Sequence, residues 1–171
     1  VIGRDVSYHG ATLGALSAGL HDRRRKGLEQ ALLSMPKTSH YDAEELEKVI
    51  ELEGPDTISA FIGEPVIGAA AGAYVPPDDY WPRISEICAR HDILVIADEV
   101  MTGFGRLGTP MGHEALQFTP DIIAAGKGLG GGYVPIGGVY CRPDVVAPIA
   151  ETDLALMFYT FAGHDLCCAV A

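Results

Sequence analysis

The 171-residue sequence lacks asparagine and has only four lysines, and these shortages exclude several kinds of protein. Without asparagine the chain has no acceptor for N-linked sugars. The 12 Lys and Arg residues face 23 Asp and Glu, and a net charge of −11 argues against binding to a nucleic-acid backbone. No apolar run is long enough to cross a membrane, so we expect neither nucleic acid nor membrane as a partner.

Cysteine and histidine patterns for metals and disulfides are also missing. The four cysteines, Cys88, Cys141, Cys167 and Cys168, show no C-x-x-C spacing. They predict buried thiols in a reducing compartment, which points to a cytoplasmic location. His113-Glu114 lacks the second histidine of a zinc-binding helix, so no metal site is expected.

Apolar runs alternate with amphipathic stretches along the chain. Hydrophobic residues make up 48% of the sequence, enough for one domain with its own core. Strands are predicted near residues 58–62, 93–97, 121–125 and 136–141, and helices near 43–53 and from the segment 76–79 to residue 91. This alternation predicts an α/β fold with a mostly parallel sheet flanked by helices.

Two of the predicted strands end in ionisable residues of opposite sign. The run 93–97 leads into Asp98-Glu99, and the run 121–125 leads into Gly126-Lys127. Open α/β sheets bind ligands at the carboxyl ends of their strands. A carboxylate and a lysine there could hold a cationic ring and a Schiff base on one cofactor, or form only a surface salt bridge.

The glycines around Lys127 match two phosphate-binding motifs incompletely. Residues 126–131 read G-x-G-x-x-G, but Tyr133 and Pro135 follow where a dinucleotide-binding motif needs a helix. Gly128 stands where a P-loop needs Ser or Thr. We instead expect Lys127 to lie in an apolar setting, which favours the neutral, nucleophilic amine.

Five segments together resemble the signatures of one family, the class III pyridoxal-phosphate aminotransferases. They occur in the family's order and extend over nearly the whole chain: residues 8–10, 62–66, 97–106, 125–133 and 160–164. The resemblance implies the type I fold of pyridoxal-phosphate enzymes. It also implies a homodimer with active sites at the subunit interface.

The resemblance implies roles for individual residues. Lys127 would form the Schiff base with the cofactor and carry the proton, and Asp98 would pair with the protonated pyridine nitrogen. Both are predicted catalytic residues. Val100 would pack on one face of the ring and Tyr8 on the other. Thr160 would contact the phosphate of the partner subunit's cofactor.

His9 and Glu64 also lie in the matching segments and are counted among the predicted cofactor-binding residues. Glu64 and Glu99 are expected to orient their neighbours. The family's phosphate-binding loop, which precedes the segment at 8–10, and its C-terminal small domain have no counterpart in the sequence. Residues 1–171 are therefore expected to be an incomplete central portion of the large cofactor-binding domain, inactive in isolation.

The predicted activity is transamination with pyridoxal 5'-phosphate. The donor would be an amine or ω-amino acid, and the acceptor a 2-oxo acid such as pyruvate. A decarboxylase or aminomutase on the same cofactor is an open alternative, because the substrate contacts lie largely outside these residues. A catalytically inactive fragment or interaction module is the other alternative.

Overall fold

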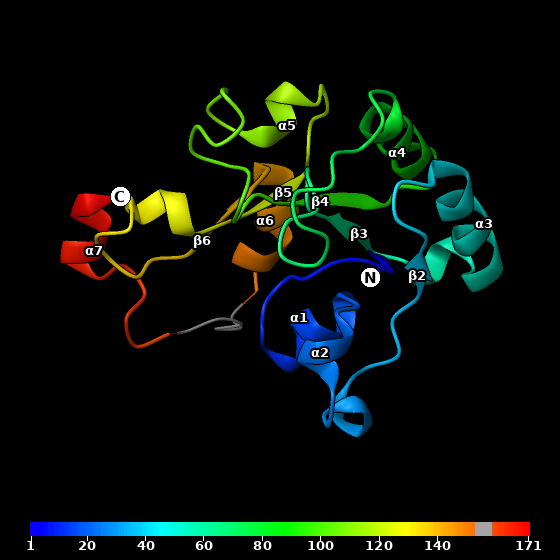
Figure 1. The fold of residues 1–171 in the computed structure, drawn as a ribbon, viewed down its shortest axis with the longest axis horizontal. Coiled ribbons are helices and arrows are strands. Elements are labelled where there is room, and N and C mark those ends of the chain that lie inside the picture. The colour runs from blue at the N-terminus through cyan, green and yellow to red at the C-terminus, as the bar shows by residue number, and fades with distance from the viewer. Residues whose placement is uncertain (153–158) are drawn as a thin grey trace.

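The computed structural model describes residues 1–152 and 159–171 (Figure 1). The strands are β1 (Gly3–Arg4), β2 (Lys37–Thr38), β3 (Ala60–Gly63), β4 (Leu94–Asp98), β5 (Ile122–Ala125) and β6 (Gly138–Cys141). The α-helices are α1 (Leu13–Ala18), α2 (Asp22–Arg25), α3 (Ala43–Glu53), α4 (Tyr80–Arg90), α5 (Gly112–Ala115), α6 (Pro143–Ala150) and α7 (Asp165–Val170). Short 3₁₀ helices are η1 (Glu29–Ala31), η2 (Pro55–Thr57) and η3 (Lys127–Gly130).

The main sheet has the strand order β3-β4-β5-β6. Strands β3, β4 and β5 are parallel, and β6 is antiparallel to β5. The register pairs Asp98 of β4 with Ala124 of β5, so β4 and β5 end at the same edge of the sheet. Strands β1 and β2 form a separate parallel pair, and Ile2 bridges to Phe61 of β3. The predicted mostly parallel sheet is confirmed.

Helices lie on two sides of the main sheet, and α4 packs directly against β4. Helices α4 and α5 lie on one side, and α1 and α2 lie on the other (Figure 1). The core contains Trp81, which stacks on Phe118 with ring centroids 4.1 Å apart. Helix α4 buries Trp81, Ile84 and Cys88 along one face, as its periodicity predicted.

The start of α3 follows from its capping residues. The Asp42 side chain accepts a hydrogen bond from the backbone N–H of Glu45. The Glu45 carboxylate bonds to the N–H of Ser39 instead of returning to Asp42, so the reciprocal capping box is incomplete. Residues 21–40, where the sequence pattern predicts neither a helix nor a strand, contain α2, η1 and β2. None of the helices in the described ranges is long and apolar enough to cross a membrane.

Candidate active site

A cleft lies at the edge of the sheet where β4 and β5 end. Its walls come from four segments that are distant in sequence: residues 8–10 after β1, 64–69 after β3, 98–101 at the end of β4, and Lys127 after β5. The predicted site residues Tyr8, His9, Glu64, Asp98, Val100 and Lys127 all line it. The fold therefore brings a carboxylate and a lysine amine to one cleft, as the strand pattern predicted.

The Asp98 carboxylate is held by two neighbours. Its Oδ2 atom lies 2.8 Å from Nδ1 of His9, and its Oδ1 atom accepts the backbone N–H of Val100 at 3.1 Å. The side chains of His9 and Asp98 are 2% and 7% exposed. A carboxylate oxygen accepts more than one hydrogen bond, so Asp98 can still receive a donor from the cleft.

Glu64 connects two walls of the cleft. Its Oε2 atom accepts the N–H of Tyr8 at 3.3 Å, and its Oε1 atom accepts the N–H of Gly68 at 3.2 Å. Burial raises the pKa of the Glu64 carboxyl, while the nearby His9 and Arg4 and the two N–H donors act in the opposite direction. The geometry is that of an orienting group.

Glu99 points away from the cleft into the protein. It is fully buried and accepts hydrogen bonds from the Thr102 hydroxyl and from the backbone N–H groups of Gly112 and His113. Its Oε1 atom also lies 3.0 Å from Nδ1 of His113. Glu99 thus ties the loop that follows β4 to α5.

Lys127 begins η3 with a φ of 43°, in the left-handed region that L-residues rarely adopt. Such strain is typical of functional positions in proteins. The residue is exposed, so the apolar setting expected for Lys127 is wrong for this chain. The apolar contact is made by its neighbour Gly126, which is buried and lies beside the Val100 side chain.

Tyr8 and Val100 line the cleft with partly buried side chains. The Tyr8 ring also contacts the edge of His21, with centroids 5.9 Å apart, and Arg24 lies over it at 5.4 Å. These contacts hold the Tyr8 ring from outside the cleft.

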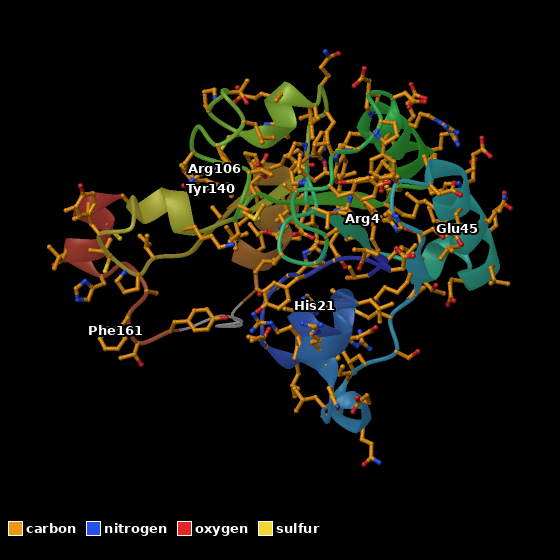
Figure 2. All side chains as sticks on the ribbon, viewed as in Figure 1. Arg4, His21, Glu45, Arg106, Tyr140 and Phe161 are labelled. Carbon is orange, nitrogen blue, oxygen red and sulfur yellow. The ribbon has the colours of Figure 1, made fainter. Side chains whose placement is uncertain are left out.

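Arg4 supports the cleft from the interior, and sequence reasoning missed it (Figure 2). It is fully buried, and its Nη2 donates to the backbone carbonyl of Glu64 at 2.6 Å. Its guanidinium lies over the rings of Tyr41 and Trp81. The signal available in the sequence was the position of Arg4, a charged residue directly after the apolar residues that begin the chain. The His9–Asp98 pair was also missed, although His9 was named as a site residue.

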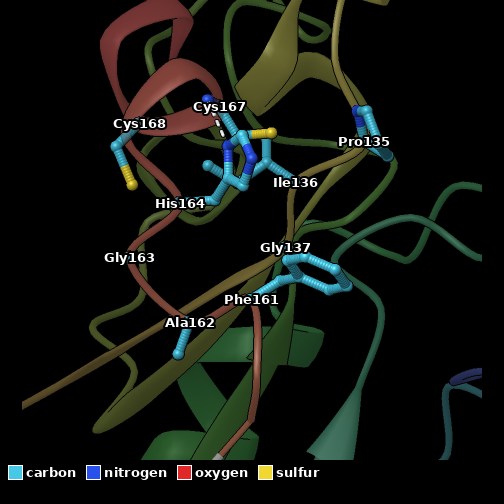
Figure 3. A pocket seen from close by; sticks show the side chains of 9 residues that line it. All are labelled: Pro135, Ile136, Gly137, Phe161, Ala162, Gly163, His164, Cys167 and Cys168. Atoms are coloured by element: carbon cyan, nitrogen blue, oxygen red, sulfur yellow. Dashed lines mark hydrogen bonds between the residues drawn. The ribbon is translucent and has the colours of Figure 1, made fainter.

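Thr160 lies outside the cleft, in an exposed turn before α7. Its predicted contact with a partner subunit's cofactor stays a prediction. A second cavity, of about 420 Å³, lies between residues 135–137 and the segment 161–168 (Figure 3). There His164 Nδ1 accepts the N–H of Cys167 at 3.4 Å, and the lining contains neither a lysine nor a carboxylate. Among the described residues, no group of three His, Cys, Asp or Glu side chains is placed to hold a metal ion.

Comparison with known proteins gives the same family over the whole chain. The family model "Aminotransferase class-III" matches residues 1–171. The chain is 39% identical to the putrescine–pyruvate aminotransferase of Pseudomonas aeruginosa, over 100% of this chain and 41% of that protein. It is 37% identical to the probable gamma-aminobutyrate transaminase 2, mitochondrial, of Oryza sativa subsp. indica, over 100% of this chain and 39% of that protein.

Solved structures agree with the sequence matches. The (S)-enantioselective omega-transaminase from Thermomicrobium roseum superposes with a TM-score of 0.94 at 38% identity, over 99% of this chain and 42% of that one. The chain thus spans about two fifths of the length of these relatives. Its fold is the type I fold of pyridoxal-phosphate enzymes, as predicted. The chain belongs to the class-III aminotransferase family.

Proposed function

We propose that this chain forms the cofactor-binding part of a pyridoxal-phosphate-dependent transaminase. The enzyme moves an amino group from an amine or ω-amino acid to a 2-oxo acid such as pyruvate. The observation that carries the proposal is that Asp98 and Lys127 follow adjacent parallel strands and line one cleft. The names of the relatives, which include a putrescine–pyruvate aminotransferase and a gamma-aminobutyrate transaminase, support this substrate class.

The residues of the cleft match the chemistry of pyridoxal phosphate. A buried carboxylate with a free acceptor direction suits a protonated ring nitrogen, and a primary amine suits an aldehyde. The cleft has a volume of about 60 Å³ and borders the exposed Lys127. With the side chains in these positions, a pyridine ring enters it only in part. When bound, the cofactor supplies an electron-withdrawing ring that stabilises negative charge at the substrate carbon.

Each residue of the chain then has a defined task. The Lys127 amine would hold the cofactor covalently and, once the substrate amine has displaced it, would carry a proton to and from the substrate carbon. The negative charge of the Asp98 carboxylate would stabilise the protonated form of the ring nitrogen. Val100 and Tyr8, which line the cleft, would restrict the movement of the ring. Glu64 keeps the walls bearing Tyr8 and Gly68 at a fixed separation.

We infer further that the working enzyme is a cytoplasmic homodimer in which Thr160 contacts the partner subunit's cofactor. Exposed apolar side chains on β6 and α6 support an interface there: Val139, Tyr140, Val146 and Ile149. The four cysteines are free thiols, which suits a reducing compartment. Only Cys88 is buried, so the expectation that all four would be buried is wrong.

The test uses the full-length protein and pyridoxal phosphate. We expect borohydride reduction to attach the cofactor irreversibly to the peptide that carries Lys127, detected by mass spectrometry. Lys127→Ala should abolish both the label and amino transfer from putrescine or gamma-aminobutyrate to pyruvate. Lys48→Ala, which removes an exposed lysine on α3, serves as the control and should leave both intact. A label on another lysine, or transfer by Lys127→Ala, would contradict the proposal.

A further inference from the structure

We propose that His9 is a positioning residue for Asp98: its Nδ1–H fixes the carboxylate in the orientation that meets the ring nitrogen. The inference rests on the proposed function and assigns His9 a role through Asp98 rather than a contact of its own with the ring. It starts from the pair of atoms His9 Nδ1 and Asp98 Oδ2, 2.8 Å apart and nearly sealed from solvent.

Two donors fix the rotation of the Asp98 carboxylate. Val100 N–H binds one oxygen and His9 binds the other, so neither oxygen can turn without breaking a hydrogen bond. With the Val100 donor alone, the carboxylate could still swing about that single bond. His9 therefore supplies the second of the two points that define its plane.

The proton between His9 and Asp98 belongs on the histidine. A carboxylate only accepts hydrogen bonds, and Oδ1 of Asp98 already accepts the N–H of Val100, so we take the ring nitrogen 2.8 Å from Oδ2 as the donor. This assigns the hydrogen to Nδ1. The same assignment leaves Nε2 without a hydrogen-bond partner in the described part of the chain, although that atom is buried.

The unpaired Nε2 argues against a purely structural role for His9. A buried polar atom without a partner destabilises the folded state, and an apolar side chain at this position would avoid that cost. The backbone around His9 does not depend on its imidazole, because the N–H of the preceding Tyr8 is held by Glu64. What the imidazole adds is the donor to Asp98.

The test compares two substitutions of similar size in the full-length protein. His9→Asn keeps an N–H donor near the position of Nδ1, and His9→Leu removes it. Each variant is titrated with pyridoxal phosphate and with an analogue in which carbon replaces the ring nitrogen. Only the natural cofactor can use the Asp98 carboxylate through a ring proton, so the analogue reports on the rest of the cleft.

We expect His9→Leu to weaken pyridoxal phosphate binding by about tenfold, the effect of losing one hydrogen bond to a charged group. The analogue should bind wild type and His9→Leu within about twofold of each other. His9→Asn should bind pyridoxal phosphate within about threefold of wild type. The proposed role of His9 would be overturned if His9→Leu lost equal affinity for pyridoxal phosphate and for the analogue. It would also be overturned if His9→Leu and His9→Asn lost equal affinity for pyridoxal phosphate.

A measurement on the wild type covers the case in which His9→Leu does not fold. The ¹⁵N NMR spectrum of histidine-labelled cofactor-free protein, assigned with His9→Asn, should show the hydrogen on Nδ1 of His9, and a hydrogen on Nε2 alone would overturn the inference. A wild-type protein that is not labelled at Lys127 refutes the proposed function. Labelling without a difference between the two cofactors in His9→Leu refutes only the role of His9.

Discussion

Replacing Asp98 by asparagine changes the charge of the cleft with almost no change in size. The Asp98 oxygens accept from His9 Nδ1 and from Val100 N–H, whereas an amide has one oxygen and one NH₂ group. One of the two donors must then face the amide NH₂. The tautomer of His9 with hydrogen on Nε2 relieves that clash, but it leaves a buried N–H without a partner in the described structure.

The tautomer change adds no unpaired group, because His9 Nε2 already lacks a partner in the wild type. What Asp98→Asn removes is the charge on the acceptor of two hydrogen bonds, which is worth about 1–3 kcal/mol. We therefore expect Asp98→Asn to lower the free energy of unfolding of the cofactor-free protein by that amount, measured by urea denaturation. Loss of the negative charge at the ring nitrogen should lower kcat/KM for transamination by about 10²–10³-fold, the scale of other fixed electrostatic contacts.

Asp121→Asn is the matched control. Asp121 accepts the N–H of Val95 and pairs with Arg142 just before β5, at the edge of the sheet opposite the cleft. That variant should lose stability and keep kcat/KM within a few-fold. If Asp98→Asn keeps its activity within a few-fold of wild type, Asp98 does not have the proposed role. If its unfolding free energy is unchanged, the described hydrogen bonds do not hold the carboxylate.

Two further predictions concern stability. Gly112→Ala should destabilise the protein by about 1–3 kcal/mol in urea denaturation, because its Cβ would lie 2.8 Å from both Glu99 Oε2 and Thr102 Cβ. Gly14→Ala, in open space on α1, is the control and should cost nothing. Burial raises the pKa of the Cys88 thiol from its usual 9.0 to about 12. The folded state thus retains a proton that the unfolded state loses, so stability should be full below pH 9 and fall as the pH rises towards 12. Urea midpoints at increasing alkaline pH should show this fall, with a smaller slope in Cys88→Ala; an equal slope would contradict it.

Periodicity predicted the parts of the fold in which local pattern and tertiary packing agree. Strand β4 is an uninterrupted apolar run and was located within one residue. The end of helix α4 was also located within one residue, but the helix begins at Tyr80 and not in the segment 76–79 that was predicted to start it. Helix α2 was missed because it is short and polar, with no apolar face to reveal it. Strand β2 has only two residues, too few to show an alternation.

The same distinction holds for the candidate site. Asp98 and Lys127 were predictable because each follows a buried strand, and parallel strands end at a common edge. The contact between His9 and Asp98 joins residues 89 positions apart, and no spacing rule relates them. The exposure of Lys127 depends on what surrounds η3 in space, which its flanking glycines do not indicate.

The left-handed backbone of Lys127 sets selection for activity against selection for stability. A lysine at φ 43° is strained by about 1–2 kcal/mol, and glycine adopts this conformation freely. Lys127→Gly should therefore match or exceed the cofactor-free wild type in resistance to urea while losing all amino transfer; a clear loss of stability would show that the strain is not real. Without selection for activity, substitutions at this position would favour a more stable but inactive protein, and only the requirement for the amine would keep lysine there.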